Sequence, residues 1–86
     1  MELKNGTVVI SKAGRDKNKP MMIVEITENG VFVCDGKERP LENPKRKNPK
    51  HLSATQYVLS PETTATNRSL KKALQQIMSQ TEREAE

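Results

Sequence analysis

Fifteen lysines and arginines outnumber eleven acids in this chain of 86 residues, and many of them gather in two polar segments. The first segment, residues 12–19, holds four of the cations: Lys12, Arg15, Lys17 and Lys19. Such side chains on a loop can contact phosphates, because arginine binds phosphate bidentately and each engaged cation releases counterions. Gly14, between them, lets the main chain approach a phosphate closely or take a positive φ. A solvated, charge-rich turn is an equally good interpretation of the composition.

The second segment, residues 37–51, contains six cations and only two acids. Its candidate contact residues are Lys37, Arg39, Lys45, Arg46, Lys47, Lys50 and His51. Pro44 and Pro49 limit backbone freedom in this run, so less entropy is lost if it orders on a partner. Because the cations are concentrated in one short segment, we expect a single surface that faces an anion. The alternative is a mobile basic loop. The last five residues reverse the sign, with three acids and one base.

Aromatic side chains are almost absent, with Phe32 and Tyr57 alone in the chain. Proteins that bind single-stranded nucleic acid stack successive bases on aromatic rings. Phe32 is expected in the core, so almost no aromatic ring is left on which bases could stack. The sequence therefore favours recognition of folded RNA by its shape and phosphates.

The residues of this chain give little indication of a catalytic site. His51 is the only histidine and has no evident nucleophile partner, and Cys34 is the only cysteine. Cys34 follows Phe32 by two positions in a strand-like run, so we expect a small core residue rather than a reactive thiolate. No Gly-rich phosphate loop, paired-carboxylate pattern or metal-ligand spacing is present, and a single cysteine cannot form an intramolecular disulfide. We expect no enzyme, no cofactor and no bound metal.

Composition limits the size of the core. Apolar residues make up 33% of the chain, below the usual ~45–50%. We therefore expect one domain, with a compact part of roughly 55 residues and a looser remainder. The sequence shows no secretory signal and no apolar run of membrane-spanning length, so a soluble, cytoplasmic protein without a membrane partner is expected.

Three β-branched, apolar runs predict strands at residues 6–11, 21–27 and 31–35. Asn29-Gly30 separates the second run from the third and predicts a hairpin with a type I′ turn, because both residues accept a positive φ. In the second run, alternation places Met22, Val24 and Ile26 on one face and Ile23 with Glu25 on the other.

Three prolines exclude residues 37–52 from a central strand, so we expect an extended segment with short edge pieces near 39–41 and 51–52. Residues 53–66 are rich in Ser, Thr, Ala and Pro and resemble a linker or a loosely held tail. These patterns divide the chain into a β domain at 1–55 and a linker at 56–66, followed by a helix at 67–82 and an acidic tail at 83–86.

A helix is predicted near the C-terminus, because the apolar residues there recur at helical spacing rather than at the spacing of a strand. Leu70, Ala73, Leu74, Ile77 and Met78 are spaced to form one face of an α-helix. Asn67 or Thr66 is a suitable N-cap. This apolar face either packs on its own domain or docks on a partner protein.

The segment from Gly6 to Val24 resembles a KOW motif, in which a strand opened by glycine leads through a Gly-containing cationic loop to a hydrophobic strand. Residues 30–36, Gly-Val-Phe-Val-Cys-Asp-Gly, are similar to a segment of KOW-bearing large-subunit ribosomal proteins. The run from Glu42 to Leu52 is similar to small bacterial KOW proteins of that group. The resemblance covers roughly residues 3–55. Asn18 stands where many members have glycine, but asparagine also tolerates a left-handed backbone.

The resemblance implies a mainly β fold, a small SH3-like barrel of the KOW type with a C-terminal amphipathic α-helix. It also implies RNA binding by a ribosomal or ribosome-associated protein of translation, a ribonucleoprotein component, through the two basic segments. Ribosomal RNA is the expected partner, with ribosomal proteins as possible contacts of the helix and no small-molecule substrate. The alternative is a KOW-type protein-interaction module of the translation or transcription machinery.

Overall fold

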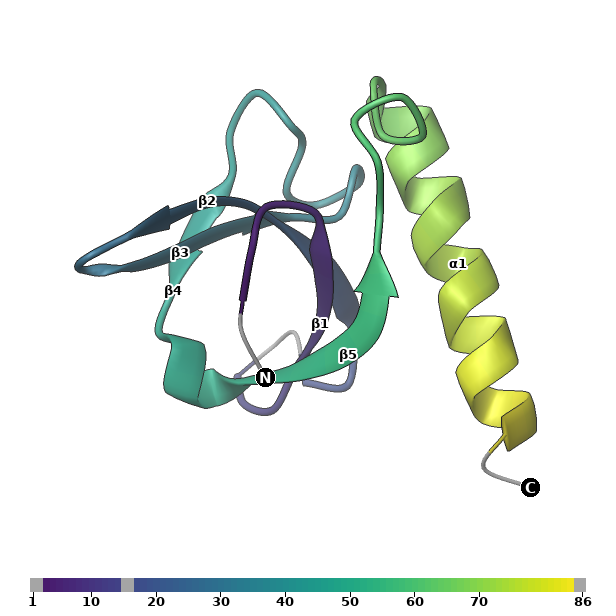
Figure 1. Cartoon of the computed structure of the whole chain (residues 1–86), viewed down its shortest axis with the longest axis horizontal. Helices are drawn as coiled ribbons and strands as arrows, with labels where there is room; N and C mark the ends of the chain where they lie inside the picture. Colours follow the sequence, from purple (N-terminus) through teal and green to yellow (C-terminus); the bar gives the residue numbers. More distant parts are fainter. Residues whose placement is uncertain (1–2, 15–16, 85–86) are drawn as a thin grey trace.

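The computed structural model describes residues 3–14 and 17–84, and the side chains of residues 3–14 and 17–79. Five strands, one short 3₁₀ helix and one α-helix follow each other along the chain (Figure 1). The elements are β1 Thr7–Ser11, β2 Pro20–Thr27, β3 Gly30–Cys34, β4 Lys45–Lys47, η1 Pro49–His51, β5 Leu52–Val58 and α1 Asn67–Glu84. The prediction of a mainly β fold with a C-terminal helix is confirmed.

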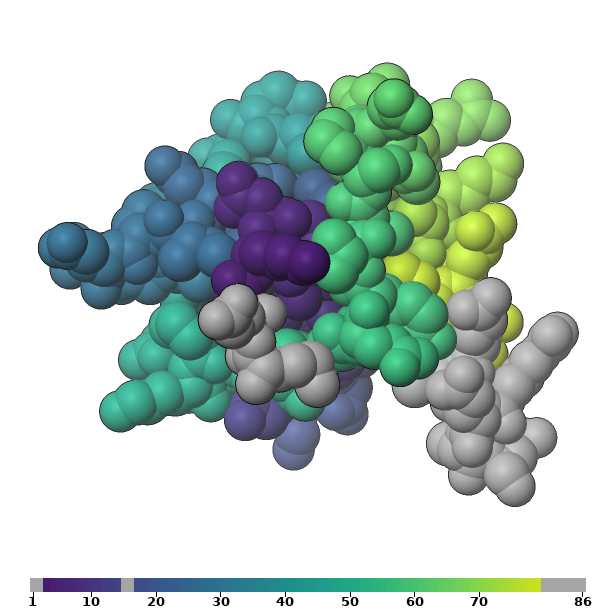
Figure 2. Space-filling model, in the orientation of Figure 1, coloured from purple at the N-terminus to yellow at the C-terminus, as the bar shows by residue number. Residues whose placement is uncertain are grey.

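The five strands form one antiparallel sheet in the order β4-β3-β2-β1-β5. β4 and β5 are therefore its two edges, although only Asn48 and η1 separate them in the sequence. The sheet curves, and α1 lies along one side of it, while the tip of the β2–β3 hairpin projects on the side away from α1 (Figures 1 and 2). None of the helices in the described part of the chain is long and apolar enough to cross a bilayer.

Two groups of apolar side chains lie on opposite faces of the sheet. The inner cluster consists of Val9, Met21, Ile23, Val31, Val33 and Leu52. The helix-side cluster consists of Val8, Met22, Cys34, Leu70, Leu74 and Ile77. Successive side chains of a strand point to opposite faces, so the adjacent residues Val8 and Val9 join different clusters. Both faces of the central strands are thus covered.

The predicted helix is confirmed, and it extends two residues beyond the predicted end at residue 82 into the predicted acidic tail. Leu70 and Leu74 are 0% and 2% exposed, so its apolar face packs on the chain's own sheet. Of the two proposed caps, Thr66 is the one whose hydroxyl accepts from the backbone N–H of Ser69, at 3.1 Å. Asn67 instead accepts from the backbone N–H of Leu41 at 2.7 Å and thereby ties the β3–β4 connection to the helix.

The β2–β3 hairpin is where it was predicted, but its turn is different. Thr27 pairs with Gly30, so the central residues of the turn are Glu28 and Asn29. Neither of these has a positive φ, and the type I′ prediction is wrong. The hydroxyl of Thr27 donates to the carbonyl of Gly30 at 2.8 Å, and the positive φ of this hairpin falls on Gly30, at 143°.

A register shift in β2 breaks the predicted alternation of its side chains. The pairing with β3 runs from Ile23 directly to Glu25, so Val24 is the extra residue of a bulge. Met22 and Val24 both belong to the helix side, as predicted, but Ile26 does not share their environment and is 44% exposed. A bulge inverts the face assignment of every residue beyond it, which is why the period-two prediction fails there.

The predicted edge pieces and linker are also corrected. Residues 39–41 form no strand and His51 belongs to η1, whereas the edge strand β4 lies at Lys45–Lys47. Residues 52–58, placed mostly in the linker, form the edge strand β5 against β1. The predicted boundary between residues 55 and 56 therefore falls inside a strand. The β sheet ends at Val58, and turns at 61–66 lead into α1.

Candidate nucleic-acid interface

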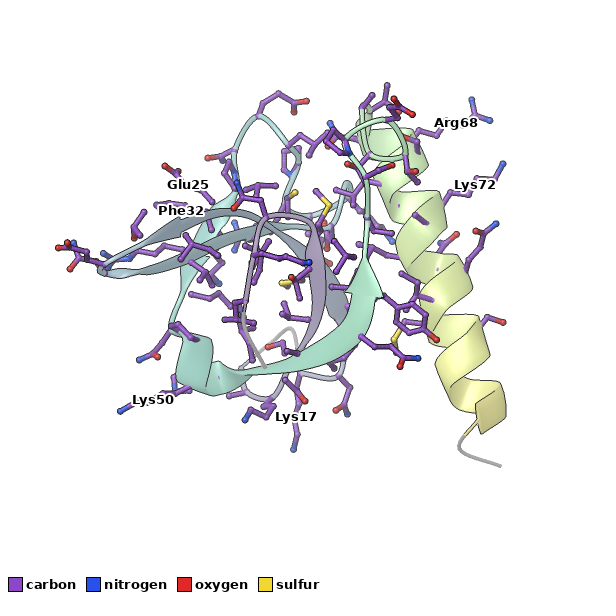
Figure 3. All side chains as sticks on the ribbon, viewed as in Figure 1. Lys17, Glu25, Phe32, Lys50, Arg68 and Lys72 are labelled. Carbon is purple, nitrogen blue, oxygen red and sulfur yellow. The ribbon has the colours of Figure 1, made fainter. Side chains whose placement is uncertain are left out.

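The two basic segments singled out in the sequence meet at one groove of about 340 Å³. The groove is lined by Ala13 and Gly14 from the β1–β2 loop and by Lys45, Arg46, Lys47, Asn48 and His51 from β4 and η1. No acidic side chain lines it among the described residues. In Figure 3, Lys17 of the loop and Lys50 of η1 both project from the same end of the molecule. Segments about 30 residues apart in the sequence thus form a single cationic surface.

Hydrogen bonds fix the two segments to each other. The backbone N–H of Lys12 donates to the carbonyl oxygen of His51 at 2.8 Å, where the loop leaves β1 and η1 leads into β5. Lys47 reaches from β4 to the fully buried Ser11, with its Nζ 3.4 Å from the hydroxyl oxygen. The two walls of the groove are therefore already held in place, and a ligand that binds there would not have to fix the position of both.

The β1–β2 loop is held by its own backbone. The N–H of Asn18 donates to the carbonyl of Ser11 at 2.7 Å, and the N–H of Lys17 donates to the carbonyl of Gly14 at 3.2 Å. Gly14 has a φ of 80° and Asn18 a φ of 69°, so both adopt the left-handed conformation. The sequence expectation that asparagine suffices at position 18 is confirmed. Apart from Gly14 and its chain neighbours, no described residue has an atom within 4 Å of the place where a side chain at Gly14 would begin, so the main chain at Gly14 is open to a ligand.

The β4 side chains alternate across the edge of the sheet. Lys45 and Lys47 pair with Val33 and Val31 and are half-buried, whereas the exposed Arg46 stands on the opposite face. Neither Lys45 nor Arg46 has an ion-pair partner among the described residues. Lysines on an edge strand also prevent sheets from pairing with each other, which is the structural reason for their presence. Protection of the sheet edge does not by itself require these lysines to lie beside the β1–β2 loop, as they do.

Asn48 positions the cations that follow it. Its side-chain oxygen accepts from the backbone N–H of Lys50 at 3.0 Å, and Pro49 occupies the first position of η1. An asparagine cap followed by proline is a known start signal for a helical turn. Sequence reasoning missed Asn48 and Ala13 as groove residues, although the Asn-Pro pair carried the signal.

The structure divides the twelve predicted contact residues into separate groups. Gly14, Lys45, Arg46, Lys47 and His51 line the groove. Lys12, Lys17 and Lys50 are exposed neighbours of the lining residues. Lys19 and Lys37 line a different cleft, and Arg39 lines neither. Arg15 lies outside the described residues. The structure thus places five of the twelve in the groove and two in a different cleft, and the contact of all twelve with RNA stays a prediction.

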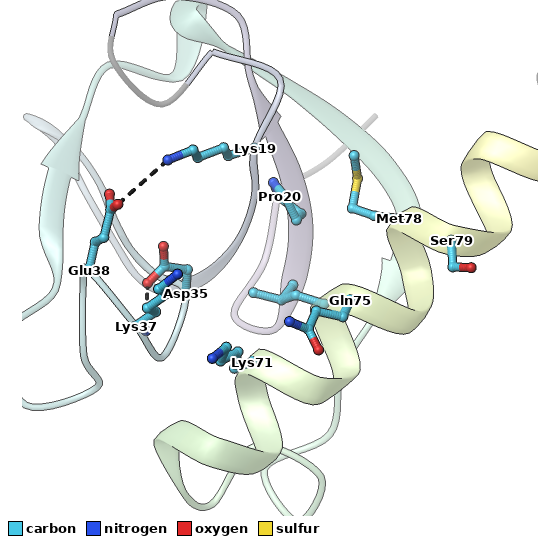
Figure 4. Close-up of a pocket in the computed structure, with 10 residues that line it drawn as sticks. Lys19, Pro20, Asp35, Lys37, Glu38, Lys71, Gln75, Met78 and Ser79 are labelled. Carbon is cyan, nitrogen blue, oxygen red and sulfur yellow. Dashed lines mark hydrogen bonds and ion pairs between the residues drawn. The ribbon is translucent and has the colours of Figure 1, made fainter.

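That second cleft, of about 390 Å³, lies between the sheet and α1 (Figure 4). Lys19, Lys37 and Lys71 line it together with Asp35 and Glu38. Lys19 forms an ion pair with Glu38 at 3.6 Å, although both side chains are about half exposed. Asp35 accepts from the backbone N–H groups of Lys37 and Arg39, each at 2.9 Å. The mixed charges of this cleft make it a weaker site for a polyanion than the groove.

Cys34 is buried in the helix-side cluster, as the sequence predicted. Burial, with a smaller contribution from the nearby Asp35 and Glu42 carboxylates, raises the pKa of its thiol from 9.0 to about 11. The thiol is therefore neutral at physiological pH, which is the opposite of an activated nucleophile. No group of metal-ligating side chains occurs among the described residues.

We predict that Cys34 resists alkylation in the folded protein and reacts only after unfolding. The stability that the neutral thiol contributes is fully present below pH 9.0 and is lost as the pH rises through about 11. The loss amounts to about 2 to 3 kcal/mol. Iodoacetamide labelling at neutral pH, with and without denaturant, checks the first statement. Denaturant titrations of the wild type and of Cys34→Ala across the alkaline range check the second, because other alkaline titrations are common to both proteins. Rapid labelling of the native protein would contradict the buried position.

Comparison of the chain with models of protein families and with curated proteins found no match.

Proposed function

We propose that this protein binds structured RNA, ribosomal RNA foremost, through phosphate contacts made by the groove between the β1–β2 loop and β4–η1. The observation that carries the proposal is the convergence of these two segments on one surface without an acidic side chain among its described lining residues. Lysine and arginine side chains that neutralise phosphates release condensed counterions, which supplies most of the affinity for a nucleic acid. Exposed main chain at Gly14 adds a place where a phosphate can approach closely.

A folded RNA suits the groove better than a long single strand. Among the described lining residues of the groove, His51 carries the only aromatic ring, so successive bases would lack a row of rings to stack on. Two rigidly connected walls match a phosphate backbone whose path is itself fixed by base pairing. Lys12, Lys17 and Lys50 extend the cationic surface around the groove, whereas Lys19, Lys37 and Arg39 are removed from the proposed contact set.

We infer that the fold belongs to the SH3-like barrels of the KOW type. The strand order and the single turn of η1 between the two edge strands support this inference, because they bring the two edges of the sheet toward each other. The left-handed Gly14 and Asn18 in the loop that resembles the KOW motif support it further. A cytoplasmic protein on or near the ribosome is the corresponding cellular role.

The decisive experiment measures binding to an RNA hairpin and to an unpaired strand of the same length while the salt concentration is varied. If the groove neutralises about four phosphates, the affinity for the hairpin falls about 100-fold between about 50 and about 200 mM salt. We expect the unpaired strand to bind more weakly throughout. Affinity that is independent of salt, or equal for the two RNAs, would overturn the proposal.

Sedimentation of cell extracts on sucrose gradients tests the proposed cellular role. We expect the protein to migrate with large ribosomal subunits and to be released by ribonuclease. The apolar face of α1 is buried in the chain's own core, so it is not free to hold a protein partner. Association with a protein complex that survives ribonuclease would favour the interaction-module alternative and would contradict RNA as the direct ligand.

A further inference from the structure

Phe32 lies in neither hydrophobic cluster, contrary to the expectation that it forms part of the core. It is half-buried and is not among the partly buried apolar residues that pack against the inner or the helix-side cluster. Its partners in the sheet are Glu25 on β2 and Arg46 on β4. Figure 3 shows Phe32 and Glu25 on the β2–β3 hairpin, away from α1. The only phenylalanine of the chain is thus set in a charged, accessible face of the sheet.

The geometry of β3 explains this position. Val31 and Val33 point into the inner cluster, so Phe32 points to the opposite face, which it shares with Cys34. Cys34 is covered by α1 through Leu70 and Leu74. Phe32 lies two residues from Cys34, about 7 Å along the strand, and is absent from the cluster to which α1 contributes its apolar residues.

Arg46 connects Phe32 to the cationic groove. It pairs with Phe32 across β3 and β4, and it also lines the groove. The stem of Arg46 passes over Gly30, with its Cγ 3.5 Å from the point where a Cβ of Gly30 would be. Phe32 and Gly30 are on the same face of β3, so the stem of Arg46 runs along the face that carries the ring. Arg46 has no ion-pair partner among the described residues, so its guanidinium is available to a ligand.

We propose that Phe32 and Arg46 form a stacking site for one unpaired nucleotide of the RNA whose phosphates occupy the groove. This inference rests on the proposed function and specifies its ligand further: a folded RNA with a bulged or flipped-out base beside the bound backbone. An aromatic ring and a guanidinium plane both stack on bases, and every base offers a π-face. The exposed Glu25 flanks the ring and can accept a hydrogen bond from an amino group of the base.

The charges around the ring fit this ligand better than a protein or a lipid surface. An apolar partner would bury Glu25 and Arg46 along with Phe32 and would have to desolvate both charges. A nucleotide satisfies all three side chains at once, because its base stacks, its edge accepts or donates hydrogen bonds and its phosphate is anionic. The remaining interpretation is that Arg46 merely covers Phe32 within the free protein.

The test uses two RNA hairpins that are identical except for a single unpaired nucleotide in one of them. The wild-type protein is expected to bind the bulged hairpin about 5- to 150-fold more tightly, which is the range found for one base stacked on an aromatic ring. Phe32→Leu keeps an apolar side chain but removes the ring, so it should abolish this preference and leave the affinity for the plain hairpin unchanged. Phe32→Tyr keeps the ring and should keep the preference.

Tyr57→Leu is the matched control, because Tyr57 is the only other aromatic residue and packs against the helix-side cluster. It should not alter the ratio of the two affinities. If the wild type binds neither hairpin, the proposed function itself fails. If it binds both equally, or if Phe32→Leu weakens both to the same extent, the groove proposal stands and the stacking site is wrong.

Discussion

Replacing Leu74 with aspartate is expected to unfold the protein. Leu74 is 2% exposed and packs in the helix-side cluster, between α1 and the sheet. Removing a leucine from a core destabilises by about 2 to 5 kcal/mol, and an unpaired carboxylate in an apolar site adds to the loss. A domain of this size has only about 5 to 10 kcal/mol of stability in total. We therefore expect Leu74→Asp to lose the cooperative thermal transition seen by circular dichroism.

Gln75→Asp is the control for this substitution. It introduces the same charge at the next position of the same helix, but Gln75 is exposed. Its effect on the free energy of unfolding should stay within about 0.5 kcal/mol. A folded Leu74→Asp protein with an unchanged melting temperature would show that α1 does not pack on the sheet. Leu74→Asp is for the same reason unsuitable as a probe of partner binding, since loss of folding would abolish any interaction.

The elements that could be predicted are those whose signal is local. β1, β2 and β3 are runs of β-branched and apolar residues, and α1 has its apolar residues at helical spacing. Each of these patterns arises because the element buries its apolar side chains, so it can be recognised in the sequence without knowledge of the rest of the fold. The hairpin was also predictable in place, though not in the conformation of its turn.

The two edge strands were missed because their residues carry little propensity of their own. β5 reads Leu-Ser-Ala-Thr-Gln-Tyr-Val, and its pairing with β1 decides its conformation. The hydroxyl of Thr55 donates to the carbonyl of Val8 at 2.7 Å, a contact between residues 47 positions apart. β4 occupies only three residues between Pro44 and Pro49; the prolines predict edge pieces rather than a central strand but do not fix their place, so the pieces expected near 39–41 and 51–52 miss β4.

Phe32 shows the limit of alternation as a guide to burial. The period-two pattern correctly places Phe32 and Cys34 on one face of β3. The sequence does not reveal how far α1 extends over that face, and the helix covers Cys34 but not Phe32. The same limit applies to the cations, because nothing in the spacing of Lys19 or Lys37 separates them from the residues of the groove. Residue types indicate which side chains could contact a phosphate, whereas the way these side chains group depends on the topology.

The proposed binding of RNA by the groove can be tested with a pair of variants of identical composition. Lys45→Gln with Arg46→Gln removes one lysine and one arginine from the groove. Arg68→Gln with Lys72→Gln removes the same two residue types from α1, where both are exposed and project away from the sheet (Figure 3). Any effect of net charge alone is the same in the two proteins, so a difference between them reports on the position of the charges.

We expect the groove variant to bind the RNA hairpin about 10- to 100-fold more weakly than the helix variant at about 100 mM salt. Each lost phosphate contact lowers the slope of log affinity against log salt by about 0.9 for a duplex, so two lost contacts lower it by about 2. The helix variant should keep the wild-type slope, because long-range attraction between exposed charges is screened beyond about 10 Å. Equal slopes for the two variants would place the bound phosphates outside the groove, since a surface that contacts RNA through Lys45 and Arg46 cannot lose both cations and release the same number of counterions.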